Sequence, residues 1–499
     1  MLHTDDMLDC RLSRRAVVQR GAMVGLAGSI LPALLAACGG GSSTPTARAT
    51  TTAPTSAPSP QPASVAATTA PATTGQSATV PASSAQAAAT TGTGGSPAPI
   101  LFVHGNGDSS ALWITALWRF ESNGYARERL FTIDYPNPTA RDDDTAPQPT
   151  RSSTEEQRTQ LAAKVDAVLA ETGASKLILV GNSRGANSIR NFVKHGGAPK
   201  VSHVLLGGGV NHGVYSAPGS QSEFNGASRF MQELNAGSEV VPGVAFMTIR
   251  SDMFDKYAQP TLASGGPSGV SYDAPELKGA MNIVVEGIDH RETAFSPRAF
   301  AEMFRFITGS AAKTEIAPEA SVRLSGLITG YENKVPTNLP VAGVAVTVYE
   351  VDPATGARIG APVQQMMTGA DGAWGALTGK PTASYEFVVQ QPGGPVRHIF
   401  RSPFPRSSSV VSIRLTDDAP TANQGLVIFT RPRGYVATGR DKHLLDGAPV
   451  PGVKPGVPTD SSFKVPITGP ERAVPVSLNG ETMTVRAIPG ELVYAEFHY

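Results

Sequence analysis

Apolar and polar residues alternate in blocks between residues 99 and 311. A helix is expected from 154 to 173, with Thr154 and Gln157 as a capping box and a glycine at its end, and another is expected at 298–307. Short apolar runs that predict strands buried on both faces lie at 100–103, 130–133, 177–180, 244–249 and 282–285. Such strands are typical of parallel sheets covered by helices, so residues 99–311 are predicted to form an α/β domain, with a mostly parallel sheet and helices on both faces.

The pattern changes near residue 312 to the alternation of β-strands. Residues 343–351 alternate strictly between apolar and polar positions, and an Asn-Gly pair within 474–485 predicts a hairpin turn. An all-β region is therefore expected at 312–416, with further β-structure at 417–499.

The first 98 residues have a different composition from the rest. Ala, Thr, Ser, Pro and Gly fill 54 of the 60 positions from 39 to 98, so this stretch is expected to be a disordered linker. Before it, Arg14 and Arg15 precede an uncharged, largely apolar run at 21–37, which predicts an export signal over residues 1–38.

The arginine pair resembles a twin-arginine signal, and the segment Leu-Ala-Ala-Cys that ends at Cys38 resembles a bacterial lipobox. The resemblance implies export by the twin-arginine pathway and acylation of Cys38. The protein would then be a lipoprotein anchored to a membrane, in the periplasm or at the cell surface. A simple cleaved signal, with a secreted product, and an uncleaved anchor are the alternatives.

Charge and cysteine content exclude several classes of partner. The chain has 41 Lys and Arg against 41 Asp and Glu, which leaves no net field to attract nucleic acid. It has two cysteines and no Cys/His cluster with the spacing of a structural zinc site, so neither a disulfide framework nor a metal is expected. No cofactor is expected either.

A pentapeptide with catalytic spacing, Gly-Asn-Ser-Arg-Gly, occupies residues 181–185 between a predicted strand and a predicted helix. A nucleophilic serine must project from a sharp turn, and Gly181 and Gly185 leave room for the neighbouring backbone. Ser183 is therefore the candidate nucleophile. The backbone N–H of Arg184, at the start of the helix, is a candidate oxyanion donor.

The loop after the first predicted strand, His-Gly-Asn-Gly-Asp at 104–108, also carries a signal. Together with the pentapeptide it resembles the lipase branch of the α/β-hydrolase superfamily. The resemblance implies that Asn106 gives the second oxyanion N–H and that His104 is structural. A phosphate-binding loop is the rival interpretation, but the lysine of a P-loop and the spacing G-x-G-x-x-G are both missing.

The superfamily order of serine, acid and histidine indicates the other two catalytic residues. His290 follows the last predicted strand and precedes the final helix, so it is the candidate base. Two aspartates follow the strand at 244–249. Asp255 fits the pattern of related hydrolases better and is the expected acid, and Asp252 remains the alternative.

The domain order resembles two-domain lipases, and residues 312–416 resemble transthyretin-like β-sandwich modules. A serine-dependent lipase or esterase is therefore predicted, acting on an ester substrate, with a lipid or polymer surface as a further partner. The loop at 104–108 also resembles polyhydroxyalkanoate depolymerases, so a polyester depolymerase is the alternative. A non-catalytic surface-binding lipoprotein is a remote third. Whether residues 208–242 form a lid, and what the β-region binds, stay open.

Overall fold

The computed structural model describes residues 97–420 and 424–499. The predicted signal, Cys38 and nearly all of the predicted linker lie outside the described residues. Within the described part of the chain, no helix is long and apolar enough to cross a membrane.

A six-stranded parallel sheet forms the centre of the first part of the chain, and its strands run in the order β2-β1-β3-β4-β5-β6. Their bounds are β1 Ile100–Val103, β2 Leu130–Ile133, β3 Leu177–Asn182, β4 Val201–Gly207, β5 Ala245–Ser251 and β6 Met281–Val285. Because neighbouring strands are parallel, their carboxyl ends meet at one edge of the sheet. The loops that follow β1, β3, β5 and β6 therefore lie close together at that edge.

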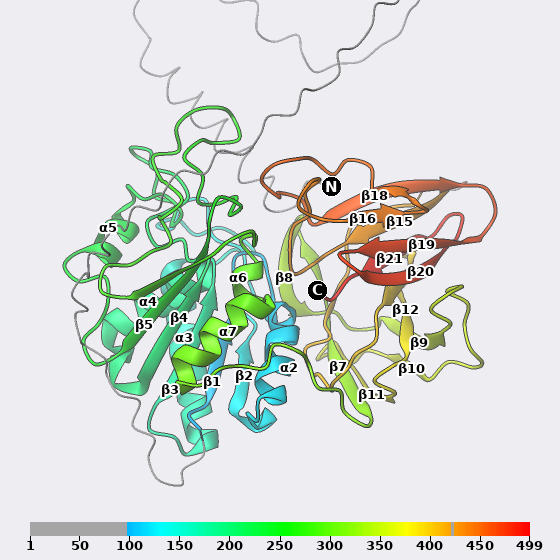
Figure 1. The fold of residues 1–499 in the computed structure, drawn as a ribbon, viewed down its shortest axis with the longest axis horizontal. Coiled ribbons are helices and arrows are strands. Elements are labelled where there is room, and N and C mark those ends of the chain that lie inside the picture. The colour runs from blue at the N-terminus through cyan, green and yellow to red at the C-terminus, as the bar shows by residue number, and fades with distance from the viewer. Residues whose placement is uncertain (1–96, 421–423) are drawn as a thin grey trace, which may run out of the picture. The chain divides into compact units, whose positions relative to one another are not determined.

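Helices cover both faces of this sheet (Figure 1). Ile100 and Phe102 of β1 pack in one apolar cluster, and Leu101 and Val103 of the same strand pack in another on the opposite face. The first face is covered by α2 (Ile114–Ser122), α6 (Glu292–Phe295) and α7 (Pro297–Thr308), and the second by α3 (Thr154–Thr172) and α4 (Arg184–Phe192). The predicted α/β architecture is confirmed.

The N-cap of α3 is one residue earlier than the sequence predicts. The capping box pairs Ser153 with Glu156, whereas Thr154 and Gln157 were expected in those roles. Thr154 instead donates its hydroxyl to Asp144, and Gln157 is buried against α4. The helix ends at Gly173, which has the left-handed conformation (φ 65°) of a glycine C-cap.

The remaining helices are short. Helix α5 (Arg229–Asn235) lies in the segment 208–242, and Ser228 caps it by accepting a hydrogen bond from the Met231 amide. Short helical turns lie at Ser110–Trp113, Arg127–Arg129, Val193–Gly197 and Ala198–Lys200.

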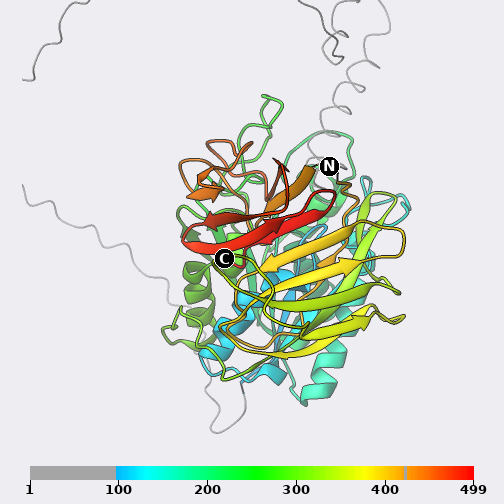
Figure 2. The ribbon, with the colours of Figure 1, turned by 90° about the vertical axis from the view of Figure 1, so that its right-hand side faces the viewer.

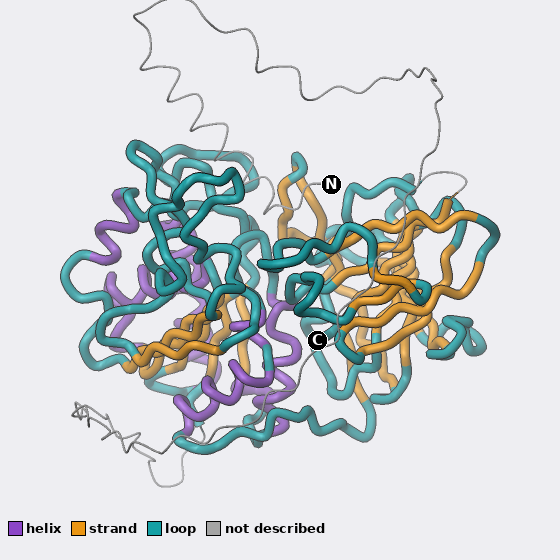
Figure 3. The backbone as a smooth tube through the Cα atoms, turned by 45° about the horizontal axis from the view of Figure 1, so that its top comes forward, coloured by secondary structure: helices purple, strands orange, loops and turns teal. Residues whose placement is uncertain are grey.

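After α7 the described residues form strands and loops without a helix (Figure 3). We call residues 322–499 the β-region. Its strands are β7 Val322–Glu332, β8 Val335–Pro340, β9 Ala345–Val351, β10 Gln364–Met367, β11 Ala373–Gly379, β12 Ser384–Gln390, β13 Val396–Arg401, β14 Ile413–Arg414, β15 Gln424–Thr430, β16 His443–Leu445, β17 Ala448–Pro449, β18 Ser462–Thr468, β19 Arg472–Leu478, β20 Glu481–Ala487 and β21 Leu492–Glu496.

The largest sheet of the β-region takes its strands from both ends of the region (Figure 2). It has seven strands in the order β10-β9-β12-β13-β21-β15-β18, and β13 pairs with β21 in parallel. The segments 312–416 and 417–499 thus contribute neighbouring strands to the same sheet. A sheet ordered β11-β7-β14, with β8 paired to β7, and a sheet ordered β17-β16-β19-β20 complete the region.

The β-region and the α/β part share an apolar core. Ile114 and Trp118 of α2 belong to the same buried cluster as Trp374 of β11. The Trp118 indole donates to the Ser407 carbonyl (3.0 Å), and its ring contacts that of His498 with centroids 5.8 Å apart. The two parts therefore bury apolar surface against each other.

Candidate active site

Ser183 occupies a sharp turn between β3 and α4. Its backbone has φ 55° and ψ −122°, a conformation that a residue with a side chain rarely adopts. The flanking glycines permit this turn. A Cβ on Gly185 would lie 2.4 Å from the carbonyl oxygen of Val103, and one on Gly181 would lie 2.6 Å from Cδ1 of Ile189. The local backbone is therefore the one that the pentapeptide predicts.

His290 lies in the loop after β6 and is hydrogen-bonded to Asp255, in the loop after β5. The distance from Nδ1 of His290 to Oδ2 of Asp255 is 2.9 Å, and both side chains are almost fully buried. The other carboxylate oxygen of Asp255 accepts from the Tyr257 amide (2.8 Å). Asp252 instead accepts from the Ser251 hydroxyl (3.0 Å). Of the two candidate aspartates, the structure brings Asp255 to His290.

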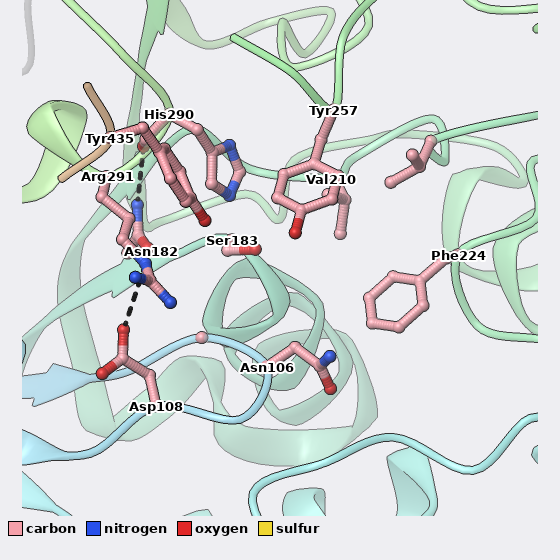
Figure 4. Close-up of a pocket in the computed structure, with 12 residues that line it drawn as sticks. Asn106, Asp108, Asn182, Ser183, Val210, Phe224, Tyr257, His290, Arg291 and Tyr435 are labelled. Atoms are coloured by element: carbon pink, nitrogen blue, oxygen red, sulfur yellow. Dashed lines mark hydrogen bonds and ion pairs between the residues drawn. The ribbon is translucent and has the colours of Figure 1, made fainter. Parts of the chain in front are cut away.

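The other ring nitrogen of His290 is available for proton transfer. Nε2 is buried and has no hydrogen-bond partner among the residues that the structure describes. It belongs to the same pocket as Ser183, and Figure 4 shows the ring between Tyr257 and Tyr435 with Ser183 beneath it. The Tyr257 ring contacts the imidazole edge-to-face, with centroids 4.7 Å apart and planes at 72°. This contact and the Asp255 hydrogen bond fix the ring.

Asn182, next to the nucleophile, joins β3 to the His290 loop. Its amide nitrogen donates to the carbonyl oxygens of Gly207 (3.0 Å) and His290 (3.2 Å). Thr293 donates its hydroxyl to the same His290 carbonyl (2.6 Å). The backbones that carry Ser183 and His290 are therefore held in register.

The pocket around Ser183 has an apolar side and a polar side, and its open space, mouth included, is about 440 Å³. Its lining residues are Gly105, Asn106, Asp108, Asn182, Ser183, Val210, Val214, Phe224, Tyr257, His290, Arg291 and Tyr435. The apolar side comes from Val210, Val214 and Phe224, all in the segment 208–242. This segment thus lines the candidate substrate site.

A buried ion pair anchors that segment to the start of α4. The Arg184 guanidinium donates to both carboxylate oxygens of Glu223 (2.9 and 2.7 Å) and to the Ser152 carbonyl (2.7 Å). Neither side chain of the pair is more than 1% exposed. Burial raises the pKa of Glu223, and the charge of Arg184 opposes this. The pair fixes the residue next to Phe224, which lines the pocket.

The loop 104–108 packs against Ser183. A Cβ on Gly105 would lie 2.9 Å from the Cβ of Ser183, so only glycine fits there without a shift. Nε2 of His104 accepts from the Tyr135 amide (3.2 Å), so Nδ1 carries the proton and donates to the Gly105 carbonyl (2.8 Å). Burial lowers the pKa of His104, which keeps the ring neutral in this arrangement.

Family models match both parts of the chain. Residues 97–268 match lipase (class 2), and residues 320–418 match the lipase C-terminal domain. The chain is a carboxylic ester hydrolase. It combines an α/β-hydrolase domain with a lipase-type C-terminal domain.

Solved structures of lipases resemble the hydrolase at low sequence identity. Lipase B of Aspergillus fumigatus is 15% identical, with a TM-score of 0.32, over 44% of this chain and 54% of its own. The mature form of Bacillus licheniformis lipase BlEst2 is 19% identical, with a TM-score of 0.33, over 43% of this chain and 93% of its own. The propeptide form of BlEst2 is 14% identical, with a TM-score of 0.33, over 78% of this chain and 93% of its own. TM-scores this low add nothing to the family matches.

The β-region of the hydrolase also contributes to the site, which the sequence reasoning did not foresee. Tyr435, from the loop between β15 and β16, lines the pocket, and its amide donates to Asp289 beside His290 (2.7 Å). Arg431 and Arg440 each donate to Glu292 (2.6 Å). Although burial alone would raise it, these two arginines lower the pKa of Glu292 to about 2.

A signal for this loop exists in the sequence. Residues 431–434 read Arg-Pro-Arg-Gly directly after an apolar run, which is an unusual density of charge for a strand end. No group of three or more His, Cys, Asp or Glu side chains in the described part of the hydrolase is arranged to hold a metal ion.

Proposed function

We propose that this hydrolase cleaves carboxylic esters through a covalent acyl-enzyme. Ser183 is the nucleophile, His290 the general base and Asp255 the residue that orients His290. One observation carries the proposal. Nδ1 of His290 is bound by a buried carboxylate, while its Nε2 is buried without a partner among the described residues, in the pocket that holds Ser183.

The reaction follows from this arrangement in two halves. His290 Nε2 takes the proton of the Ser183 hydroxyl while the oxygen attacks the ester carbonyl, and the protonated ring then gives that proton to the departing alcohol. In the second half, His290 takes a proton from water, and the resulting hydroxide attacks the acyl-enzyme. The carboxylic acid leaves and Ser183 regains its proton. Asp255 stabilises the imidazolium in both halves.

We assign the oxyanion site to the backbone N–H groups of Asn106 and Arg184. Arg184 is the first residue of α4, where backbone N–H groups have no partner within the helix. Asn106 follows Gly105, whose hypothetical Cβ would lie 3.4 Å from the Ser183 hydroxyl oxygen. Its own side-chain oxygen accepts from the Ala140 amide (2.7 Å), which anchors the loop on the far side. Donors at such positions are typically worth about a hundredfold or more in kcat each.

The acyl chain of the substrate is proposed to lie along Val210, Val214 and Phe224, the apolar side of the pocket. This favours a lipase or esterase substrate with an apolar acyl group. Hydrolysis of soluble p-nitrophenyl esters of increasing chain length, of emulsified triglyceride and of polyester film separates a lipase or esterase from a depolymerase. High turnover on film with little on the soluble esters would favour the depolymerase.

Replacing the nucleophile tests the mechanism. Ser183→Ala is expected to lower kcat by about a millionfold, because the chemical step loses its attacking group. Ser202→Ala is the matched control, since Ser202 lies on β4 with its hydroxyl bound to the Leu177 carbonyl. Activity retained in Ser183→Ala would overturn the mechanism.

We further propose, from the sequence signal alone, that the hydrolase is exported and anchored to a membrane through acylated Cys38. Lipid chains would supply the anchor because the charge-balanced chain has no net attraction for anionic lipid. Cys38→Ala is expected to abolish incorporation of labelled fatty acid and to move activity from the membrane to the soluble fraction. A wild-type protein that takes up no label would contradict the proposal.

A further inference from the structure

Two polar side chains of the β-region bind the backbone of the loop 104–108. Asn338, on β8, donates its amide to the carbonyl oxygens of Asp108 (2.9 Å) and Tyr135 (3.0 Å). Arg414, on β14, donates to the carbonyl oxygen of Gly107 (2.6 Å) and, more weakly, to that of Asp108 (3.3 Å). The same guanidinium donates to the side-chain oxygen of Asn338 (2.6 Å). The two side chains are thus joined to each other as well as to the loop.

These contacts leave the loop little freedom, because its carbonyl groups are bound one after another. His104 binds the Gly105 carbonyl, Arg414 that of Gly107, and Asn338 that of Asp108. The Gly107 amide is also bound, to the Pro138 carbonyl (3.1 Å). A peptide group is planar, so fixing a carbonyl fixes the N–H that follows it. The Gly105 carbonyl lies in the same plane as the Asn106 N–H, so His104 sets the direction of that N–H, while Arg414 and Asn338 hold the residues of the loop that follow it.

We infer that Asn338 and Arg414 are positioning residues for the oxyanion site, supplied by the β-region to the loop that carries Asn106. The inference rests on the proposed function, in which the Asn106 N–H binds the developing oxyanion. Neither side chain touches the substrate pocket; both act through the loop. The β-region therefore takes part in the chemical step, beyond packing against α2.

Arg414→Met in the full chain tests this inference, because it removes the donors to the loop and keeps an apolar stem of similar length. A displaced oxyanion donor raises the barrier of the chemical step and leaves ground-state binding nearly unchanged. We expect kcat on a soluble ester to fall by about ten- to a hundredfold, with KM close to that of the wild type. Arg414→Lys, which keeps a charged donor group but loses the fork of the guanidinium, should lose less.

The matched control is Arg406→Met. Arg406 is also an arginine of the β-region that contacts the α/β part, through Glu121 of α2 (2.8 Å). It also donates to the Ala317 carbonyl (2.8 Å), in the segment between α7 and the β-region, and it makes no hydrogen bond to the loop 104–108. Its kcat should stay near the wild-type value. If Arg406→Met loses as much as Arg414→Met, the effect is one of docking between the two parts, and the inference is wrong.

The affinity for a transition-state analogue separates a positioning role from a merely structural one, because only a displaced oxyanion donor weakens the binding of the analogue. A trifluoromethyl ketone forms a tetrahedral adduct with the catalytic serine, and its oxygen takes the place of the oxyanion. Its Ki in Arg414→Met should rise by the same factor by which kcat/KM falls. A Ki equal to that of the wild type would overturn the inference.

A second variant decides the question if Arg414→Met does not fold. Asn338→Ser removes the amide donor to Asp108 and Tyr135 and one acceptor of Arg414, and it keeps the guanidinium that donates to Gly107. A loss of kcat at unchanged KM supports the inference, and wild-type kcat overturns it. Failure of the proposed function is distinguishable, because the wild type itself would then show no esterase turnover and no adduct at Ser183.

Discussion

Asp255→Asn is expected to lower kcat/KM by about ten-thousandfold, which corresponds to about 5 kcal/mol of transition-state stabilisation. The size of the loss follows from the hydrogen bonds of the carboxylate. One oxygen accepts from the Tyr257 amide, and the other accepts from Nδ1 of His290. In the variant, the Tyr257 N–H can be satisfied only by the amide oxygen, so the amide NH₂ faces His290. The ring must then carry its proton on Nε2, the atom that has to accept the proton of Ser183.

Asp252→Asn is the matched control for this prediction. Asp252 lies three residues away in the same loop, but it binds the Ser251 hydroxyl and does not contact His290. Its kcat/KM should stay within about tenfold of the wild type. The assay is hydrolysis of a soluble p-nitrophenyl ester, with circular dichroism to show that both variants are folded. Near-normal activity in a folded Asp255→Asn, or an equal loss in Asp252→Asn, would refute the reasoning.

Three further predictions concern buried groups, two beside the site and one in the core that the two parts of the chain share. Glu223→Gln leaves the buried Arg184 charge uncompensated and should lower the free energy of unfolding by about 3 kcal/mol at pH 8, measured by urea denaturation; an unchanged midpoint would contradict this. Gly105→Ala places a Cβ about 2.9 Å from that of Ser183 and should cut kcat by about a hundredfold in a folded protein, whereas wild-type turnover would show that the loop yields. Burial holds the pKa of His498 well below 6.5, so below that pH the unfolded chain binds a proton that the folded one does not. Stability should therefore fall by about 1 kcal/mol between pH 7.5 and 5.5 from this group, and His498→Gln should show a flatter pH dependence in urea titrations.

The sequence predicts the α/β part well because its signals are local. The apolar runs that became β1, β3 and β5 are buried almost throughout, as such runs predict. The runs that became β2 and β6 lie at the edges of the sheet, where β2 is half-buried and Met281 and Val284 of β6 are exposed, so the expectation of burial on both faces was wrong for these two strands. The capping box of α3 shows the limit of such signals. Ser153-x-x-Glu156 and Thr154-x-x-Gln157 are both capping-box patterns, with serine the more favoured N-cap, and Asp144, ten residues away, binds Thr154 instead.

The candidate site also has residues that local patterns identify and residues that only the fold brings together. Ser183 and the flanking glycines form a contiguous pattern with a steric reason for each position, so they can be predicted from the sequence. Asp255 and Asp252 share one loop, and only the three-dimensional path of that loop shows which of them reaches His290. Tyr435 lies more than a hundred residues beyond any other member of the pocket, in a loop that lies at the site because two parts of the chain dock. Local patterns carry no information about such contacts.

Active-site labelling tests the central claim most directly. A fluorophosphonate reacts with an activated serine and leaves a stable adduct that mass spectrometry assigns to one peptide. Incubated with the full chain, it should modify Ser183, at one adduct per molecule, and ester hydrolysis should be lost at the rate at which the adduct forms. Asp255→Asn should react far more slowly. An adduct on a different residue, or an unmodified Ser183 in a preparation that still hydrolyses esters after treatment, would contradict the account.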